Sequence, residues 1–344
     1  MVRVAEELGF EDVFLAFAVE GDLPLTHAGH VRADLDRLIT AADVLHLHGL
    51  WAPLLRVTAV RASRLGAPYV IRPAGMLDPW CLTQRRLKKK VAMLLSFRRI
   101  LNRALFLHAL NRDERDLIGP LKLTCPFEVI PNGLFLDEID AALSQKNSDS
   151  PRPHPSERPY FLFLSRLHYK KGLDILADAF AVFVERGGEM DVIVAGPDDG
   201  EKEAFNRRVR DHGNDRRVHV VGPIYGPQKL QMLRDAVAFV LPSRQEGFSL
   251  AITEAMAARV PVLITEGCHF PEVAEVGAGI VTRLDGQEFA DAMTRVAGDA
   301  SAAAAMGRAG RALVESRYTW TTIAEQSVDA YRRHMTREET DTAS

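Results

Sequence analysis

The stretch LPSRQEGFSLAITEAM, residues 241–256, contains two glutamates, Glu246 and Glu254, eight positions apart. An apolar run precedes it, Gly247 would let the backbone come close to a ligand, and Ser249 is expected to cap a helix that carries Glu254. The two carboxylates cannot be neighbours on one helix face, but they could bind two ends of an extended ligand through its hydroxyls. An exposed loop glutamate and a surface helix glutamate are the plainer alternative. Against it, Glu254 lies among Ala, Ile, Thr and Met, where a charge needs a partner.

A second stretch, LSRLHYKKG at residues 164–172, places Arg166 just after an apolar strand, with Lys170 and Lys171 shortly before a helix. Cations at a strand end beside a helix N-terminus suit a diphosphate, because Arg offers a forked contact and Lys a compact charge. A solvated basic loop is the alternative.

Three further strand ends are weaker candidates. HLHGLW puts His46 and His48 at alternate positions of a strand end, where a neutral imidazole could donate a hydrogen bond; a structural histidine is the alternative. VIVAGPDDG (192–200) and VHVVGPIYG (218–226) each contain a glycine and a proline, and tight turns after strands account for both.

The segment 83–106, TQRRLKKKVAMLLSFRRILNRALF, has eight Lys or Arg residues and no acidic residue. We expect one amphipathic helix, because apolar residues recur at helical spacing at Leu87, Val91, Leu94, Leu95, Ile100, Leu101 and Leu105. A basic amphipathic helix is typical of contact with an anionic membrane surface, and a domain helix with a solvated basic face is the alternative. Nucleic acid is not favoured, because the net charge of the chain is −3.

These motifs are spaced along alternating strand-like and helix-like segments, which predicts parallel sheets covered by helices. The Pro-rich stretch before residue 159 indicates a linker. We therefore expect an N-terminal domain (1–147), a linker (148–158) and a C-terminal domain (159–317). A helix over 318–335 would pack back on the first domain, and 336–344 would be a disordered tail. A ligand would bind in the cleft between the domains, at the carboxyl ends of the strands. The opening residues read as a helix end and a weak strand, so the first strand–Gly-turn unit is expected to be missing.

Composition sets broader limits. At 344 residues, with 47% hydrophobic and 26% charged residues, the chain is typical of a two-domain globular protein. Cys81, Cys125 and Cys268 are too few and too widely spaced for a disulfide framework, and no Cys/His spacing resembles a zinc site. A reducing compartment, and therefore the cytoplasm, fits best. The sequence shows no signal-peptide core and no apolar run long enough to span a bilayer.

Taken together, the motifs resemble the family 4 retaining glycosyltransferases. FLSRLHYKKGLDIL looks like the family's donor-phosphate turn and EGFSLAITEA like its E-x7-E signature. The resemblance is strong over residues 159–331 and moderate over 43–133, through LHLHGLW, GMLDPW and VIPNG. It is nearest to bacterial enzymes of exopolysaccharide or lipopolysaccharide synthesis. It implies the GT-B fold, which has two Rossmann-like doubly wound domains with a cleft between them.

The resemblance also implies roles for individual residues. Arg166 and Lys171 would bind the donor diphosphate, Glu246 hydroxyls of the transferred sugar, and Glu254 the ribose; His48 would face the acceptor. The residues expected to be catalytic are thus Arg166, Lys171, Glu246 and His48. Further donor-binding positions are the backbone of Gly247, Phe248 and Ser249, the loop Pro223, Ile224 and Tyr225 near the base, and Gly196. Many members carry a histidine where this chain has Ala74.

The implied reaction moves a sugar from a nucleotide-diphosphate sugar to a hydroxyl of a glycan or lipid-linked acceptor, with retention and without a metal or cofactor. A lipid-linked acceptor would suit peripheral contact of residues 84–103 with the inner face of the cytoplasmic membrane. Two alternatives stay open: a nucleotide-sugar epimerase of the same fold, and an incomplete protein that binds nucleotide sugars without catalysis.

Overall fold

The computed structural model describes residues 28–84, 86–144 and 154–342. The chain divides into two compact units: Met1–Pro131 with Ile323–Ser344 form unit 1, and Asn132–Thr322 form unit 2. The predicted weak first strand and most of the predicted linker, residues 148–153, lie outside the described residues. No helix in the described part of the chain combines the length and apolar character needed to cross a membrane.

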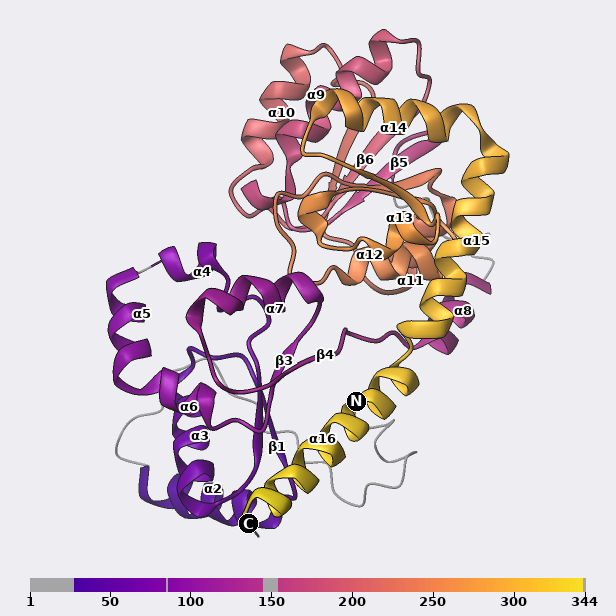
Figure 1. The fold of residues 1–344 in the computed structure, drawn as a ribbon. Helices are drawn as coiled ribbons and strands as arrows, with labels where there is room; N and C mark the ends of the chain where they lie inside the picture. Colours follow the sequence, from indigo (N-terminus) through magenta and orange to yellow (C-terminus); the bar gives the residue numbers. More distant parts are fainter. Residues whose placement is uncertain (1–27, 85, 145–153, 343–344) are drawn as a thin grey trace. The chain divides into compact units, whose positions relative to one another are not determined.

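Unit 1 contains a parallel sheet whose described strands are adjacent in chain order: β1 (Leu45–His48), β2 (Tyr69–Arg72), β3 (Leu107–Ala109) and β4 (Phe127–Val129). Its helices include α2 (Ala28–Ala41), α3 (Pro53–Leu65) and α7 (Arg112–Ile118), with a 3-10 turn at Gly119–Leu121. The last helix, α16 (Trp320–Thr342), packs on this sheet from residue 323 onward (Figure 1). It extends to Thr342, so the prediction of a disordered tail from residue 336 is wrong over the described residues.

The predicted basic helix forms one helical run from Arg86 to Asn102, with a π-helical turn inside it, and a separate short helix precedes it. The structure has α4 (Pro79–Thr83), α5 (Arg86–Ala92), a π-helical turn η2 (Met93–Phe97) and α6 (Arg98–Asn102). Pro79 favours a separate start for α4, where the Asp78 side chain caps the Cys81 N–H group. The chain leaves the helix before Leu105, which is buried just before β3.

Unit 2 contains a six-stranded parallel sheet in the order β10-β9-β8-β5-β6-β7. The strands are β5 (Tyr160–Leu164), β6 (Asp191–Ala195), β7 (Val218–Gly222), β8 (Ala238–Leu241), β9 (Val262–Thr265) and β10 (Gly279–Thr282). The central strands are apolar because helices cover both faces. The strand order reverses between β5 and β8, and this is the place where doubly wound sheets bind ligands.

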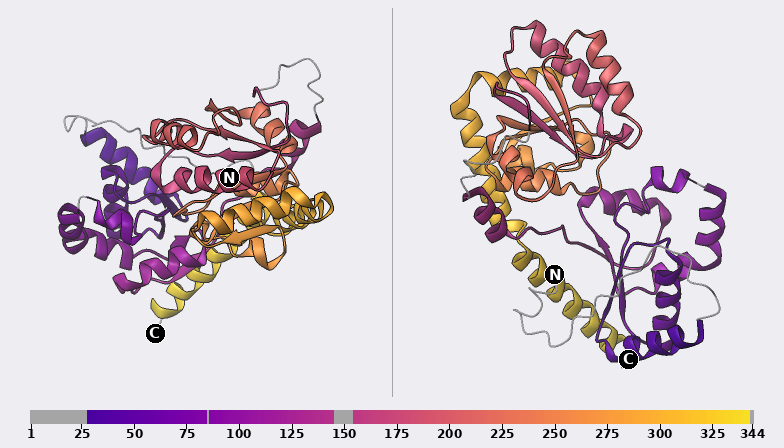
Figure 2. Two further views of the ribbon diagram at one scale, coloured as in Figure 1. Left: turned by 90° about the horizontal axis from the view of Figure 1, so that it is seen from above. Right: turned by 180° about the vertical axis from the view of Figure 1, so that it is seen from behind.

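The helices α9 (Leu173–Glu185), α10 (Lys202–Asp211) and α14 (Gly286–Gly298) lie on one face of this sheet, as Figures 1 and 2 show. The other face carries α11 (Gly226–Asp235), α12 (Leu250–Ala257) and α15 (Ala300–Arg317). Short elements complete the unit: the 3-10 turns η4 (Tyr169–Lys171) and η5 (Glu266–Cys268), and α13 (Glu272–Glu275). The prediction of two parallel-sheet α/β domains is confirmed.

Unit 2 begins earlier than the predicted boundary. Helix α8 (Leu136–Ser144) falls within the stretch assigned to the first domain, but it packs against α11 and α12. Ile139 joins the core of unit 2, and Asp140 pairs with Arg311 at 2.7 Å. These contacts hold α8 in unit 2.

Candidate functional site

The loops that follow β5 and β8 are bonded to each other. The Lys170 carbonyl accepts from the Arg244 N–H at 2.7 Å and from the Ser243 hydroxyl at 3.0 Å. Gly172 ends the first loop with φ of +68°, and a Cβ there would lie 1.9 Å from the Pro242 carbonyl oxygen. Only glycine permits this approach, which fixes the loop that carries Lys171 beside the loop that carries Glu246.

Lys171 and Glu246 form an ion pair across the two loops. Lys171 Nζ lies 2.6 Å and 2.8 Å from the two carboxylate oxygens of Glu246. Ser243 Oγ also lies 2.5 Å from Glu246 Oε1, so its single hydroxyl proton is shared between this carboxylate and the Lys170 carbonyl. The side chains are 14% and 7% exposed, so this is a largely buried charge pair at the carboxyl ends of β5 and β8.

Arg166 follows β5 on the same edge of the sheet and pairs with Asp199, which follows β6, at 2.6 Å. Both side chains are exposed to solvent. The loops approach closely because Gly196 has φ of +151°, and a Cβ there would lie 1.8 Å from the Ser165 carbonyl oxygen. Gly196 therefore has a clear structural role, whatever ligand the loop binds.

The loop after β8 leads directly into α12. Ser249 is the N-cap residue by position, but its side chain makes no capping hydrogen bond. The Phe248 ring packs in an aromatic cluster with Phe270 and Tyr318, so only its backbone is available to a ligand at this point. A Cβ on Gly247 would meet nothing within 4 Å, so open space adjoins this backbone.

Glu254, on α12, has the partner that its apolar sequence surroundings predict. Lys229 Nζ, on α11, lies 2.7 Å from Glu254 Oε1. Helix α11 starts directly after the loop that holds Pro223, Ile224 and Tyr225; Ile224 packs on the core, and Tyr225 is 73% exposed. The loop predicted to contact the base thus leads into helix α11, which carries Lys229, the partner of Glu254.

In unit 1, His48 ends β1 and is exposed. Arg72, at the end of the neighbouring strand β2, donates to His48 Nδ1 at 3.2 Å, which leaves the His48 Nε2–H group as a donor. Although part of the side chain reaches solvent, desolvation of the ring against its neighbours and the nearby Arg72 charge lower the pKa of His48 to about 4. His48 is therefore neutral at physiological pH, as the sequence interpretation requires.

His46 has a structural role. Its ring stacks on that of His48, with centroids 4.6 Å apart. A chain of hydrogen bonds runs from the Tyr331 hydroxyl on α16 to His46 Nδ1 (2.5 Å), from His46 Nε2 to His108 Nδ1 (3.1 Å), and from His108 Nε2 to the Ile130 carbonyl (2.5 Å). This donor order fixes the neutral tautomers, and burial lowers the pKa of His46 and, to about 3, that of His108.

Ala74 lies in an exposed turn after β2. Its φ is +50°, and Gly75 follows with +78°. The Gly75 N–H donates to the buried carboxylate of Glu114 at 2.5 Å, which anchors the turn.

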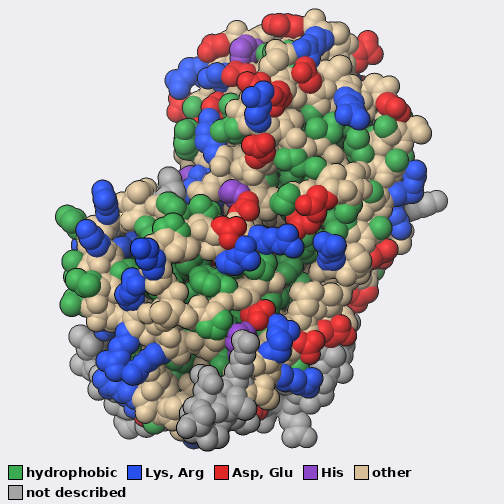
Figure 3. Space-filling model, in the orientation of Figure 1, with side chains coloured by type: hydrophobic (Ala, Val, Ile, Leu, Met, Phe, Trp, Pro, Cys, Tyr) green, Lys and Arg blue, Asp and Glu red, His purple; other side chains and the backbone are tan. Residues whose placement is uncertain are grey.

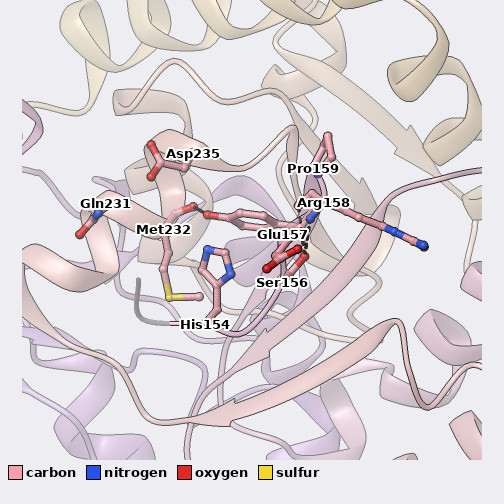
Figure 4. A pocket seen from close by; sticks show the side chains of 9 residues that line it. His154, Ser156, Glu157, Arg158, Pro159, Gln231, Met232 and Asp235 are labelled. Carbon is pink, nitrogen blue, oxygen red and sulfur yellow. Dashed lines mark hydrogen bonds between the residues drawn. The ribbon is translucent and has the colours of Figure 1, made fainter. Parts of the chain in front are cut away.

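A pocket of about 340 Å³ lies at the other end of the strands in unit 2 and contains none of the predicted residues. In Figure 4, Gln231, Met232 and Asp235 of α11 lie on one side and Ser156, Glu157 and Arg158 on the other. The candidate site is thus the network of loops after β5, β6 and β8, and not this pocket.

The structure adds residues that the sequence did not point to: Asp199, Lys229, Ser243 and Arg72. A second network, in which Arg244 contacts both Asp174 oxygens at 2.8 Å and 2.6 Å and stacks 4.3 Å over Tyr169, braces the 3-10 turn η4. Asp199 had a signal, because GPDDG places acids at the same sheet edge as Arg166. Lys229 had none, because only the packing of α11 on α12 shows it.

Two family models match the chain. The model described as "Glycosyl transferases group 1" matches residues 144–313, and "Glycosyl transferase 4-like domain" matches residues 10–133. Together they span residues 10–313 apart from a short gap.

Two relatives that are similar in sequence are named as glycosyltransferases. The chain is 24% identical over 305 residues to GDP-mannose:cellobiosyl-diphosphopolyprenol alpha-mannosyltransferase of Xanthomonas campestris, covering 85% of this chain and 74% of the relative. It is 28% identical over 218 residues to GDP-mannose-dependent alpha-(1-6)-phosphatidylinositol monomannoside mannosyltransferase of Mycobacterium tuberculosis, with coverage of 60% and 55%. It thus spans about three quarters of the first relative and about half of the second.

Solved structures show the same fold. HepE of Anabaena in complex with UDP superposes with a TM-score of 0.71 at 20% identity, covering 90% of this chain and 84% of that one. Sucrose-phosphate synthase of Thermosynechococcus elongatus gives 0.64 at 20% identity, with coverage of 94% and 81%. The chain has the GT-B fold and belongs to the group 1, family 4-type glycosyltransferases, which use nucleotide-sugar donors.

Proposed function

We propose that this protein is a retaining glycosyltransferase of cell-surface polysaccharide synthesis. It would move a sugar from a nucleotide-diphosphate sugar to a hydroxyl of a glycan or lipid-linked acceptor. The observation that carries the proposal is the buried Lys171–Glu246 pair, which joins the ends of β5 and β8 where the strand order reverses.

In this proposal the departing diphosphate is bound by Arg166, by Lys171 and by the first backbone N–H groups of α12. Negative charge on the diphosphate grows as its bond to the sugar breaks, and preorganised cations and N–H groups stabilise it without a metal. Lys171 has three N–H donors, and Glu246 accepts from it at two positions, so one donor can point to a phosphate oxygen. Glu246 Oε2 keeps capacity to accept from a sugar hydroxyl.

Transfer would take place on one face of the sugar. The bond from the anomeric carbon to the phosphate oxygen breaks, and the acceptor oxygen bonds to the same face. The acceptor proton passes to the departing phosphate oxygen, so no side chain is needed as a nucleophile. His48 would donate from Nε2–H on the acceptor side.

The nucleotide would be bound by the remaining predicted residues. Glu254, positioned by Lys229, would accept from the ribose hydroxyls, and the loop of Pro223, Ile224 and Tyr225 would contact the base. Gly196 would let the loop after β6 approach the donor.

The acceptor class is supported by the name of the Xanthomonas relative, which specifies a diphosphopolyprenol acceptor. A lipid-linked acceptor would require the protein in the cytoplasm, at the inner face of the membrane. It would also give the basic segment 84–103 a membrane to contact.

The test is incubation of the purified protein with GDP- and UDP-sugars, with and without a panel of glycoside and polyprenyl-diphosphate-linked acceptors. We expect acceptor-dependent release of the nucleoside diphosphate, a product of unchanged anomeric configuration by NMR, and full activity in EDTA. Inversion would reject the same-face route, and loss of activity on chelation would reject the metal-free step. An epimer formed from donor alone would identify an epimerase, and tight donor binding without turnover would identify a non-catalytic binder.

A further inference from the structure

Helix α5 and the following π turn expose four apolar side chains, which we call the leucine face: Leu87, Val91, Leu94 and Leu95. The three leucines are 79%, 82% and 77% exposed, and Val91 is 53% exposed. Their spacing puts them on one side of the helix. An amphipathic helix of a soluble domain normally turns its apolar side to the core, so this arrangement needs an explanation.

The π turn separates the leucine face from the buried face. The Arg98 N–H bonds to the Met93 carbonyl, one residue further back than in an α-helix. The extra residue rotates α6 by about 100° relative to α5, so the apolar residues of the two helices no longer line up. Ile100 and Leu101 enter the core of unit 1, while the leucine face stays in solvent.

Exposed cations flank the leucine face: Arg86, Lys88, Lys90 and Arg99. The sequence has no acidic residue between Asp78 and Asp113. Lys89 differs from its neighbours because it turns inward, where its Nζ lies 2.6 Å from the Cys81 carbonyl and 5.1 Å from the Trp51 ring centre. Figure 3 shows hydrophobic side chains protruding at the edge where Figure 1 places α5, with Lys and Arg side chains beside them.

We propose that the leucine face and its flanking cations dock on a bilayer surface that contains anionic lipids. The apolar side chains would enter the boundary between headgroups and acyl chains, and the cations would contact the lipid phosphates. The charge pattern favours this occupant. A second copy of the chain would bring like charges together, and nucleic acid would leave three leucines in water. The proposal does not depend on which sugar is transferred.

The experiment is sedimentation of the full chain with vesicles of phosphatidylcholine alone, or of an equimolar mixture of phosphatidylcholine and phosphatidylglycerol. We expect binding to the mixed vesicles only. Leu94→Ser with Leu95→Ser should lower the partition coefficient at least about tenfold, because leucine burial is lost. Lys88→Glu with Lys90→Glu should lower it by a similar factor, because each basic residue contributes to attraction by anionic lipid.

Matched controls lie in unit 2. Leu284 is 45% exposed, so Leu284→Ser tests the loss of an exposed leucine elsewhere. Arg207→Glu with Arg210→Glu on α10 makes the same change of net charge. Both controls should bind as the parent does, and all variants should keep the parent's circular dichroism.

Three results would overturn the proposal. The parent could fail to bind mixed vesicles, or the serine variant could bind as well as the parent, which would indicate electrostatic adhesion only. The parent could also self-associate in sedimentation velocity through the leucine face, which would make it an interface between copies. Donor hydrolysis or transfer to a water-soluble acceptor should be unchanged in the serine variant, so membrane docking and sugar transfer can fail separately.

Discussion

Lys171 and Glu246 are 75 positions apart in the chain, yet the Lys171 ammonium contacts both carboxylate oxygens of Glu246, at 2.6 Å and 2.8 Å. The pair is largely buried, whereas the neighbouring Arg166–Asp199 pair is exposed. Removal of one partner of a buried pair leaves the other charge uncompensated, but an exposed pair contributes little to stability. The two cations should therefore behave differently when replaced.

We expect Arg166→Ala and Lys171→Ala each to lose about 2–4 kcal/mol of transition-state stabilisation, measured as kcat/KM, because each removes a preorganised donor to the leaving group. Only Lys171→Ala should also lower the free energy of unfolding, by about 3 kcal/mol, because Glu246 stays buried. The exposed Arg207→Ala is the control for both measurements. Parent-like turnover by either variant would remove that residue from the proposed phosphate site.

Glu254→Gln tests the nucleotide end of the site. The parent should bind a ribonucleoside diphosphate more tightly than its 2′-deoxy analogue, because the Glu254 carboxylate would accept a hydrogen bond from the ribose 2′-hydroxyl. The side-chain amide of Gln is a weaker acceptor than a carboxylate. In Glu254→Gln this preference for the ribonucleotide should shrink several-fold. The variant also removes the ion pair of Glu254 with Lys229. Isothermal titration calorimetry with the two nucleotides measures the ratio. An unchanged ratio would place the ribose elsewhere.

Gly172→Ala should disrupt the junction of the loops after β5 and β8. A Cβ at Gly172 would lie 1.9 Å from a backbone oxygen, whereas at Gly200, where φ is +96°, it would meet nothing within 4 Å. Gly200→Ala should cost about 1–2 kcal/mol for its backbone conformation alone. Gly172→Ala should cost about 3 kcal/mol or more, because backbone must also move. Urea unfolding compares the two, and equal losses would mean that the junction is easily deformed.

The histidine chain should make unit 1 less stable in acid. Burial lowers the pKa of His108 to about 3, from an ordinary value of 6.5. The unfolded chain therefore binds more protons than the folded chain below pH 6.5. Stability is full above that pH and falls as the pH drops towards 4, by up to about 1.4 kcal/mol per pH unit for His108.

His108→Gln should reduce this slope, because an amide can accept from His46 and donate to the Ile130 carbonyl without titrating. Urea midpoints between pH 7 and pH 4.5 provide the measurement, with His269→Gln of unit 2 as the matched substitution. A slope equal to the parent's would mean that other groups control the acid response.

Sequence patterns pointed to the residues of the candidate site that lie at or near strand ends. Arg166, Lys171, Glu246 and Glu254 follow or flank apolar strands, and parallel strands bring such positions to one edge. Their partners were harder to find, because Asp199 and Lys229 depend on strand order and on the packing of α11 against α12. The π turn at Met93–Phe97 was missed for a different reason. Helical spacing cannot show one extra residue in a turn, so it predicted that Leu94 and Leu101, seven positions apart, share a face.

The placement of α16 has a consequence for the order in which the chain folds during synthesis. Residues 132–322 of unit 2 leave the ribosome before residues 323–342, which complete unit 1. The contacts of Tyr331 with His46 and of His334 with Glu128, at 2.5 Å and 2.8 Å, must wait for that last segment. Unit 2 can therefore reach its folded state first, while the sheet of unit 1, made earlier, stays without its final helix. A chain that ends at residue 322 would contain every residue of unit 2 but would lack the helical segment that completes unit 1.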